Sequence, residues 1–94
     1  MGDLASLRAV VRGRVQGVYF RAFVAEKADD LNLKGYVCNL RGGKEVEVCA
    51  EGERVQLEKL IGYLRLGSPA SRVEDVTMEW SEFAGTYATF SILY

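Results

Sequence analysis

The 94-residue sequence contains no histidine, two cysteines and one proline. Without histidine, the protein lacks the side chain most often used as a general base near neutral pH, and a zinc site would need unusual ligands. Cys38 and Cys49 lie too far apart in sequence for a CxxC redox or metal motif, and one pair is not the disulfide framework of a small secreted domain. We therefore expect neither a metal nor a cofactor.

The sequence also has no apolar run long enough to cross a bilayer. The N-terminal segment Met1–Leu4 lacks the basic and then apolar plan of a secretory signal. Apolar residues make up 49% of the chain, which is enough for one packed core, and the net charge of −1 gives no overall attraction to nucleic acid. We expect one domain over residues 1–94, which acts as a cytoplasmic monomer and binds neither membranes nor nucleic acid.

Apolar residues alternate with polar ones in some segments and recur at helical spacing in others. The predicted strands are Leu7–Arg14, Lys34–Leu40, Lys44–Glu51, Arg72–Trp80 and Thr86–Tyr94, and the predicted helices are Arg21–Asn32 and Glu53–Leu66. Arg41-Gly42-Gly43 predicts a hairpin turn, and the alternation of Lys44–Glu51 predicts one packed face and one face in water. The order βαββαβ plus a last strand predicts an α+β, ferredoxin-like fold, with an antiparallel sheet and two helices on one face.

The segment Gly13–Arg21 joins the first strand to the first helix and suits an anion. A helix N-terminus has unpaired N–H groups with partial positive charge, and successive loop N–H groups can curl around an anion. No proline interrupts Val15–Phe20, Gly17 allows close approach of the main chain, and Arg21 adds a planar cation that matches phosphate oxygens. An ordinary strand-to-helix turn with a surface arginine fits the same spacing, and no Walker pattern is present.

Two segments carry a more specific pattern. Gly13–Arg21 reads GRVQGVYFR, and Gly35–Gly43 reads GYVCNLRGG. They resemble the two signatures of the acylphosphatase family, GxVQGVxFR and GxVxNxxxG, at every fixed position and at the expected separation. The resemblance continues to the C-terminal half and covers nearly the whole chain, while Tyr19 and Cys38 occupy variable positions of the signatures.

The resemblance implies an acylphosphatase that hydrolyses the carboxyl–phosphate bond of a small acyl phosphate. It implies that Asn39 orients the attacking water and that Arg21 binds the phosphoryl group. Main-chain N–H groups of the loop complete the implied phosphate site, namely those of Val15, Gln16, Gly17, Val18, Tyr19 and Phe20. Neither a metal nor a covalent phosphoenzyme is implied, and the loop itself contains no Ser, Thr, Cys, Lys, Asp or Glu to act as nucleophile or base.

Asn39 and Cys38 each have a simpler interpretation. An asparagine before a hairpin often hydrogen-bonds the local backbone, although an amide also suits a water-positioning role because it donates and accepts without titrating. Cys38 suggests a cysteine-based phosphatase, but that chemistry needs Cys-x5-Arg and the sixth residue after Cys38 is Lys44. We expect Cys38 to be a half-buried strand residue.

Three other functions fit parts of the sequence. An RNA-binding module of this architecture carries basic and aromatic residues on its third strand, whereas Lys44–Glu51 carries glutamates and no aromatic residue. A metallochaperone would need CxxC in the first loop. An acylphosphatase-like domain of a hydrogenase-maturation protein would be followed by zinc-finger cysteines. This sequence contains none after Cys49, so we expect a free-standing enzyme.

Overall fold

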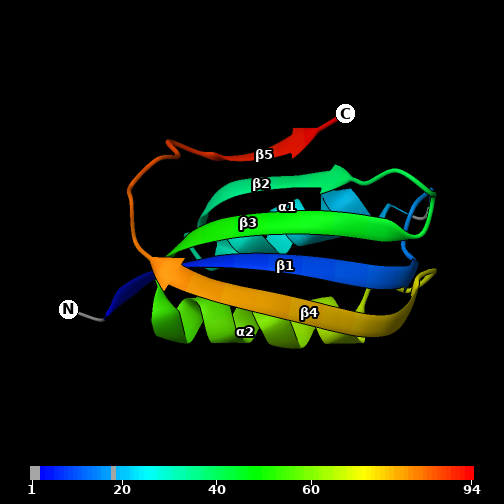
Figure 1. The fold of residues 1–94 in the computed structure, drawn as a ribbon, viewed down its shortest axis with the longest axis horizontal. Coiled ribbons are helices and arrows are strands. Elements are labelled where there is room, and N and C mark those ends of the chain that lie inside the picture. Colours follow the sequence, from blue (N-terminus) through cyan, green and yellow to red (C-terminus); the bar gives the residue numbers. More distant parts are fainter. Residues whose placement is uncertain (1–2, 18) are drawn as a thin grey trace.

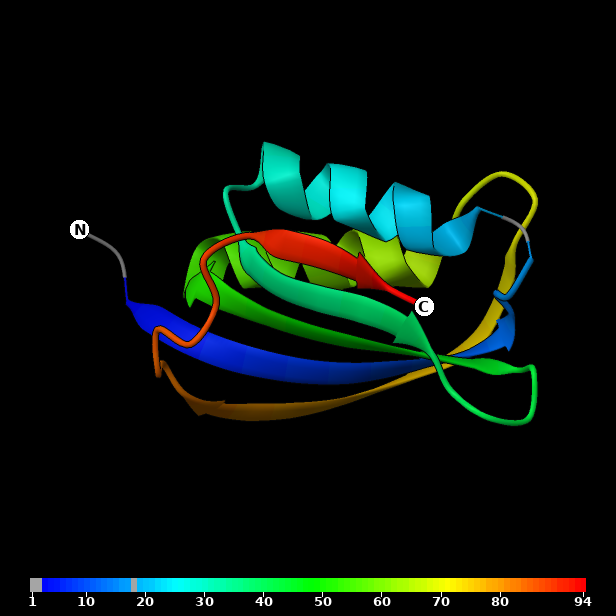
Figure 2. The ribbon, with the colours of Figure 1, turned by 90° about the horizontal axis from the view of Figure 1, so that it is seen from above.

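The computed structural model describes residues 3–17 and 19–94. In this part of the chain, five strands form one sheet in the order β4-β1-β3-β2-β5, and two helices cover one of its faces (Figures 1 and 2). The strands are β1 Leu4–Arg14, β2 Lys34–Asn39, β3 Glu45–Glu53, β4 Arg72–Glu82 and β5 Phe90–Leu93, and the helices are α1 Phe20–Asp30 and α2 Arg54–Leu66. The predicted α+β, ferredoxin-like fold is confirmed.

Pairing among the first four strands is antiparallel throughout, as predicted. β5 instead runs parallel to β2, so the complete sheet is mixed. Figure 1 shows the reason: the chain leaves β4 at one edge, crosses the end of the sheet and enters β5 at the opposite edge. β5 therefore ends near the same end of the sheet as β2 does.

The core lies between the sheet and the helices. β1 and β3 present alternate apolar residues to it, and both helices add one apolar face. Its fully buried members include Val11, Val46, Val48, Phe20, Val24, Leu57, Leu60 and Leu64. Burial of each large apolar side chain contributes roughly 1.5–3 kcal/mol to stability. Within the described residues, no helix is long and apolar enough to span a membrane.

Helix α1 ends two residues before the predicted Asn32. Asn32 has φ 60°, and its N–H donates to the carbonyl of Asp29 at 3.0 Å. The N–H of Leu33 donates to the carbonyl of Ala28 at 2.8 Å. These two bonds form a Schellman motif, which satisfies the last carbonyls and turns the chain toward β2. Helical spacing continues past such a cap, so the apolar pattern alone overestimates the length of the helix.

The structure corrects two further expectations. β5 begins at Phe90 rather than at Thr86, because residues 83–89 cross the end of the sheet as irregular chain. Glu51 was expected on a face in water, but its side chain is buried and only 4% exposed. The crossing segment covers it, and the main-chain N–H groups of Ala84 and Thr86 donate to its carboxylate.

Candidate active site

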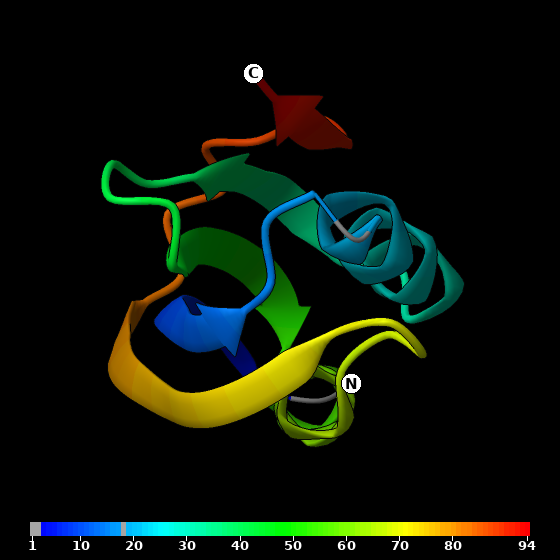
Figure 3. The ribbon, with the colours of Figure 1, turned by 90° about the vertical axis from the view of Figure 1, so that its right-hand side faces the viewer.

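The loop between β1 and α1 lies at the end of the sheet seen in Figure 3, and its residues Gly17 and Tyr19 are exposed. Gly17 has φ 71° and Tyr19 has φ 59°, so both occupy the left-handed region. In the described part of the chain, the N–H groups of Gly17, Tyr19 and Phe20 donate to no protein acceptor. They lie at the start of α1, where the helix dipole adds partial positive charge. This loop therefore has the properties of an anion-binding site.

The side chain of Gln16 fixes the position of this loop. Its Nε2 donates to the carbonyl of Leu40 at 2.8 Å and to that of Glu45 at 2.9 Å. Both carbonyls lie at the base of the hairpin between β2 and β3, where the N–H of Leu40 also donates to Glu45. The sequence predicted a main-chain role for Gln16 and missed this anchoring role. The fixed glutamine of the first signature was the available signal.

Arg21, in the first turn of α1, lies beside the end of β5. Its Nη1 donates to the carbonyl of Leu93 at 2.8 Å, and its guanidinium lies 4.7 Å from the centre of the Tyr94 ring. Two contacts from the C-terminal strand thus hold the cation, one a hydrogen bond and one a cation–π contact. The sequence pattern placed Tyr94 at the end of the last predicted strand and did not connect it with Arg21.

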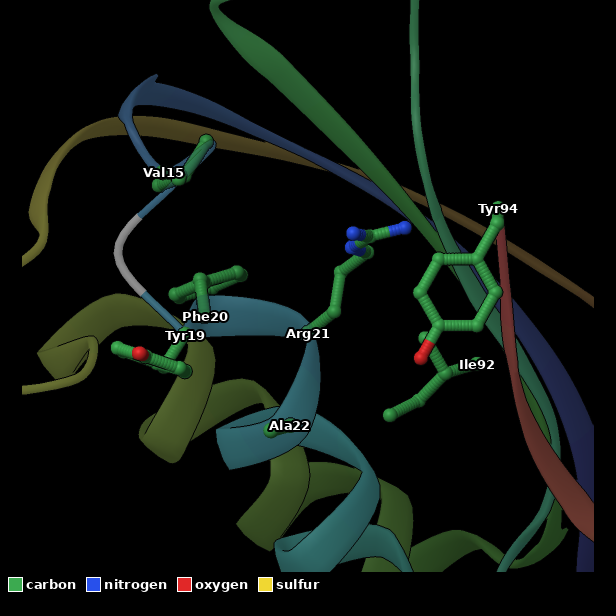
Figure 4. Close-up of a pocket in the computed structure, with 8 residues that line it drawn as sticks. Val15, Tyr19, Phe20, Arg21, Ala22, Ile92 and Tyr94 are labelled. Atoms are coloured by element: carbon green, nitrogen blue, oxygen red, sulfur yellow. The ribbon is translucent and has the colours of Figure 1, made fainter.

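A pocket of about 440 Å³ opens between the loop, the start of α1 and the end of β5. Its lining residues are Val15, Gly17, Tyr19, Phe20, Arg21, Ala22, Ile92 and Tyr94. In Figure 4, Arg21 rises between Val15 and Tyr94, whereas the Tyr19 side chain points away from the guanidinium. The tyrosine ring is 87% exposed. The structure thus brings together most of the predicted phosphate-binding residues, and Val18 lies outside the described residues.

Asn39 is the last residue of β2 and pairs with Val46 of β3. It directly follows Cys38, which pairs with Leu93, the residue whose carbonyl accepts from Arg21. Asn39 is exposed and does not line the pocket. Within the described residues, its side chain makes no hydrogen bond to the hairpin, so the turn-forming interpretation gains no support.

Arg8 and Cys38 lie on the open face of the sheet, opposite the helices, and their contacts are away from the loop. Arg8 bridges Glu47 at 2.7 Å and Glu79 at 3.4 Å. Cys38 is half-buried, as expected, and its thiol donates to Glu47 at 3.6 Å. Burial raises the pKa of the Cys38 thiol, and the contact with Glu47 raises it further. These conditions disfavour a thiolate, which argues against a cysteine-based phosphatase.

The side chains that line the described pocket include no carboxylate, thiol, imidazole or amine, so their polar groups are one guanidinium and two phenols, beside the main-chain groups of the loop. Such a site can bind and orient an anion without forming a covalent bond to it. The acylphosphatase family model matches residues 7–92, which include both signatures. The chain belongs to the acylphosphatase family. It is an acylphosphatase by family, and therefore a hydrolase.

Two acylphosphatases match this chain over nearly the whole length of both proteins. An acylphosphatase of Dehalococcoides mccartyi is 47% identical over 88 residues, which cover 94% of this chain and 97% of that protein. The crystal structure of acylphosphatase from Bacillus subtilis matches with a TM-score of 0.91 and 40% identity, covering 96% of this chain and 99% of that one. Full-length HypF, in its phosphate- and nucleotide-bound form, matches with a TM-score of 0.84 and 32% identity, but over only 12% of that chain.

Proposed function

We propose that this acylphosphatase hydrolyses the carboxyl–phosphate bond of small acyl phosphates without a metal, through binding and alignment alone. Arg21 and the main-chain N–H groups from Val15 to Phe20 hold the phosphoryl oxygens. Asn39 orients the attacking water. The observation that carries this proposal is that Arg21 lines one pocket together with Gly17, Tyr19 and Phe20, whose N–H groups have no acceptor among the described residues.

The proposed binding mode matches the charge of the reacting group. Three non-bridging oxygens of the phosphoryl group carry the negative charge, and the loop offers several N–H donors close together. Arg21 donates one N–H to Leu93, which leaves the rest of its donor fork for phosphate oxygens. Donors that are already in place stabilise the transition state without reorganisation.

The proposed water position lies at the end of β2. The Asn39 amide can accept a hydrogen bond from water and donate another to the substrate, and it is exposed for both. Gln16 ties the loop to Leu40, the residue after Asn39, so the spacing between phosphate and water is set by the fold. Alignment of this kind supplies a large part of the rate enhancement when the nucleophile is water and the protein supplies none of its own.

The proposed reaction needs no acid for the leaving group, because a carboxylate is a weak base. Water attacks phosphorus, the bond from phosphorus to the acyl oxygen breaks, and the carboxylate leaves with that electron pair. The proton of the water passes to an oxygen of the phosphoryl group itself. This route agrees with a described pocket lining in which no side chain is a carboxylate, amine or imidazole that could act as a base.

The test is hydrolysis of acetyl phosphate and benzoyl phosphate in the presence of a chelator. We expect turnover unaffected by the chelator, competitive inhibition by inorganic phosphate, and almost no hydrolysis of p-nitrophenyl phosphate, a monoester without a carboxylate leaving group. Asn39→Ala should lower kcat by roughly 100-fold while leaving inhibition by phosphate unchanged. Loss of activity on chelation would contradict the metal-free route, and full turnover by Asn39→Ala would remove Asn39 from the mechanism.

A further inference from the structure

A buried carboxylate lies at the end of the sheet farthest from the pocket. Glu51 is on β3, 4% exposed, beneath the segment that connects β4 with β5 (Figure 1). A buried carboxylate is unfavourable unless several donors satisfy it. Within the described residues, Glu51 forms no ion pair with an arginine or lysine, so its partners are all hydrogen-bond donors.

These donors come from two different parts of the chain. The Ser6 hydroxyl of β1 donates to Oε2 at 2.7 Å. The main-chain N–H of Ala84 donates to Oε2 at 3.1 Å, and that of Thr86 donates to Oε1 at 2.9 Å. Burial opposes ionisation of Glu51, but hydrogen bonds from Ser6 and from the main chain at 84, 86 and 87 outweigh it, and its pKa lies below the usual value. The carboxylate thus binds the 83–89 segment to the sheet.

The segment that Glu51 binds leads directly to the contacts of Arg21. The Tyr87 ring packs edge-on against Tyr36, with centroids 5.9 Å apart, and the carbonyl of Thr89 accepts from the N–H of Gly35 at 3.0 Å. β5 then follows β2 in parallel register as far as Leu93, whose carbonyl accepts from Arg21. Each step is a packed or hydrogen-bonded contact.

We propose that Glu51 is a positioning residue for the reaction: it fixes the entry of β5 and thereby the Leu93 carbonyl and the Tyr94 ring that hold Arg21. This inference rests on the proposed role of Arg21 as the phosphate-binding cation. β5 has four residues and pairs with β2 alone, so its start depends on the contacts that the segment before it makes, those of Tyr87 and Thr89 with β2 and those of residues 84 and 86 with Glu51. When the segment is released, the two contacts that keep the guanidinium toward the pocket weaken.

A purely structural role for Glu51 makes a different prediction. A variant that is only less stable contains fewer folded molecules, which lowers the apparent kcat but leaves KM and the phosphate inhibition constant of the remaining enzyme unchanged. A displaced Arg21 weakens the binding of every phosphoryl group, so KM for acyl phosphate and the inhibition constant for inorganic phosphate rise together. This joint rise separates positioning from stability.

The experiment compares Glu51→Ala, Glu51→Gln and a control, Met78→Ala. Met78 packs against the core from β4, at the edge of the sheet opposite β5. Thermal unfolding is measured first, and acetyl phosphate kinetics are measured well below every midpoint. We expect Glu51→Ala to raise KM and the phosphate inhibition constant by roughly 10-fold, since a charge-assisted hydrogen bond is weakened. Glu51→Gln keeps one carbonyl oxygen and should lie between Glu51→Ala and the unaltered protein.

Met78→Ala should lose stability with KM and the phosphate inhibition constant unchanged. A folded Glu51→Ala protein with unchanged values of both constants would overturn the inference, while the proposed function would stand. A parallel rise in both constants in Met78→Ala would also overturn it, because any loss of packing would then disturb the site. Failure of the unaltered protein to hydrolyse acetyl phosphate with chelator present would instead contradict the proposed function itself.

Discussion

Two irregular segments lie at opposite ends of the sheet (Figure 1). Both include main-chain N–H groups that donate to no main-chain acceptor of the described residues and are therefore available to an anion. Val15, Gly17 and Tyr19 follow β1 and line the pocket with Arg21. Residues 83–89 precede β5 and donate to the carboxylate of Glu51. The first segment adjoins an open pocket, whereas the second donates to a carboxylate that β3 of the same protein supplies.

The two segments therefore differ in the source of their anion: the protein itself supplies one, and the solution would supply the other. The carboxylate of Glu51 is always present, so it holds residues 83–89 permanently against the sheet. We call Glu51 and this segment the clamp. The N–H groups of the loop lie at a helix start beside a pocket, where an anion from solution can enter and leave. The same hydrogen-bond chemistry therefore serves structure at one end and ligand binding at the other. The predictions below test this division.

The largest effect is expected from Arg21→Ala, which removes the only side-chain cation of the described pocket lining. kcat/KM for acetyl phosphate should fall by roughly 1,000-fold, and competitive inhibition by phosphate should disappear. Thermal stability should change little, because the arginine lies at the protein surface. Arg21→Lys keeps the charge but not the planar donor pair, and should recover only a small part of the activity. Steady-state kinetics of both variants check this, and strong phosphate inhibition in Arg21→Ala would disprove it.

A smaller effect is expected from Gly17→Ala. Gly17 has φ 71°, and a Cβ there would meet no protein atom within 4 Å, so the cost within the protein is conformational. An alanine in this region costs roughly 1 kcal/mol. The new methyl group should also stand in the pocket and lower kcat/KM by roughly 10- to 100-fold. Unfolding and kinetics measured together test whether the loss of activity exceeds the loss of stability. Activity that falls only in step with stability would show that Gly17 serves the turn alone.

The position of the loop between β1 and α1 was predictable from the sequence, because residues close together in the chain determine it. Gly17, for example, has φ 71°, a conformation that glycine adopts without strain. The contacts between Glu51 and residues 83–89 were not predictable from the sequence. Glu51 alternates with buried residues as a solvent-facing glutamate does, and the segment that covers it lies more than thirty residues later in sequence. The contact of Arg21 with Tyr94 was missed for the same reason, since only the parallel placement of β5 brings them together.

The clamp predicts a specific dependence of stability on pH. Glu51 has a pKa in the folded protein below its usual 4.5, so its stabilising contribution is complete above the unfolded-state pKa. The contribution is lost as the pH falls through the folded-state pKa. Glu51→Gln should lower Tm at pH 7 by several degrees, roughly 4–8 °C for each kcal/mol lost. The difference in Tm should shrink as the pH falls below about 4.5, where the unaltered protein also loses the charge. A difference independent of pH would show that the charge is not what holds the segment.

The smallest effect is expected at Tyr19, inside the loop but directed away from Arg21 (Figure 4). Its ring is 87% exposed, and its φ of 59° is unfavourable for most side chains. Asparagine tolerates this conformation, so Tyr19→Asn should raise stability by up to about 1 kcal/mol. Tyr19→Ala is the matched control, because it removes the ring without relieving the backbone strain. Both variants should keep kcat/KM within about threefold, since an exposed ring contributes little. A large rise in KM in both variants would show that the ring contacts the substrate, so that the side chain of Tyr19 would join its main-chain N–H in the binding site.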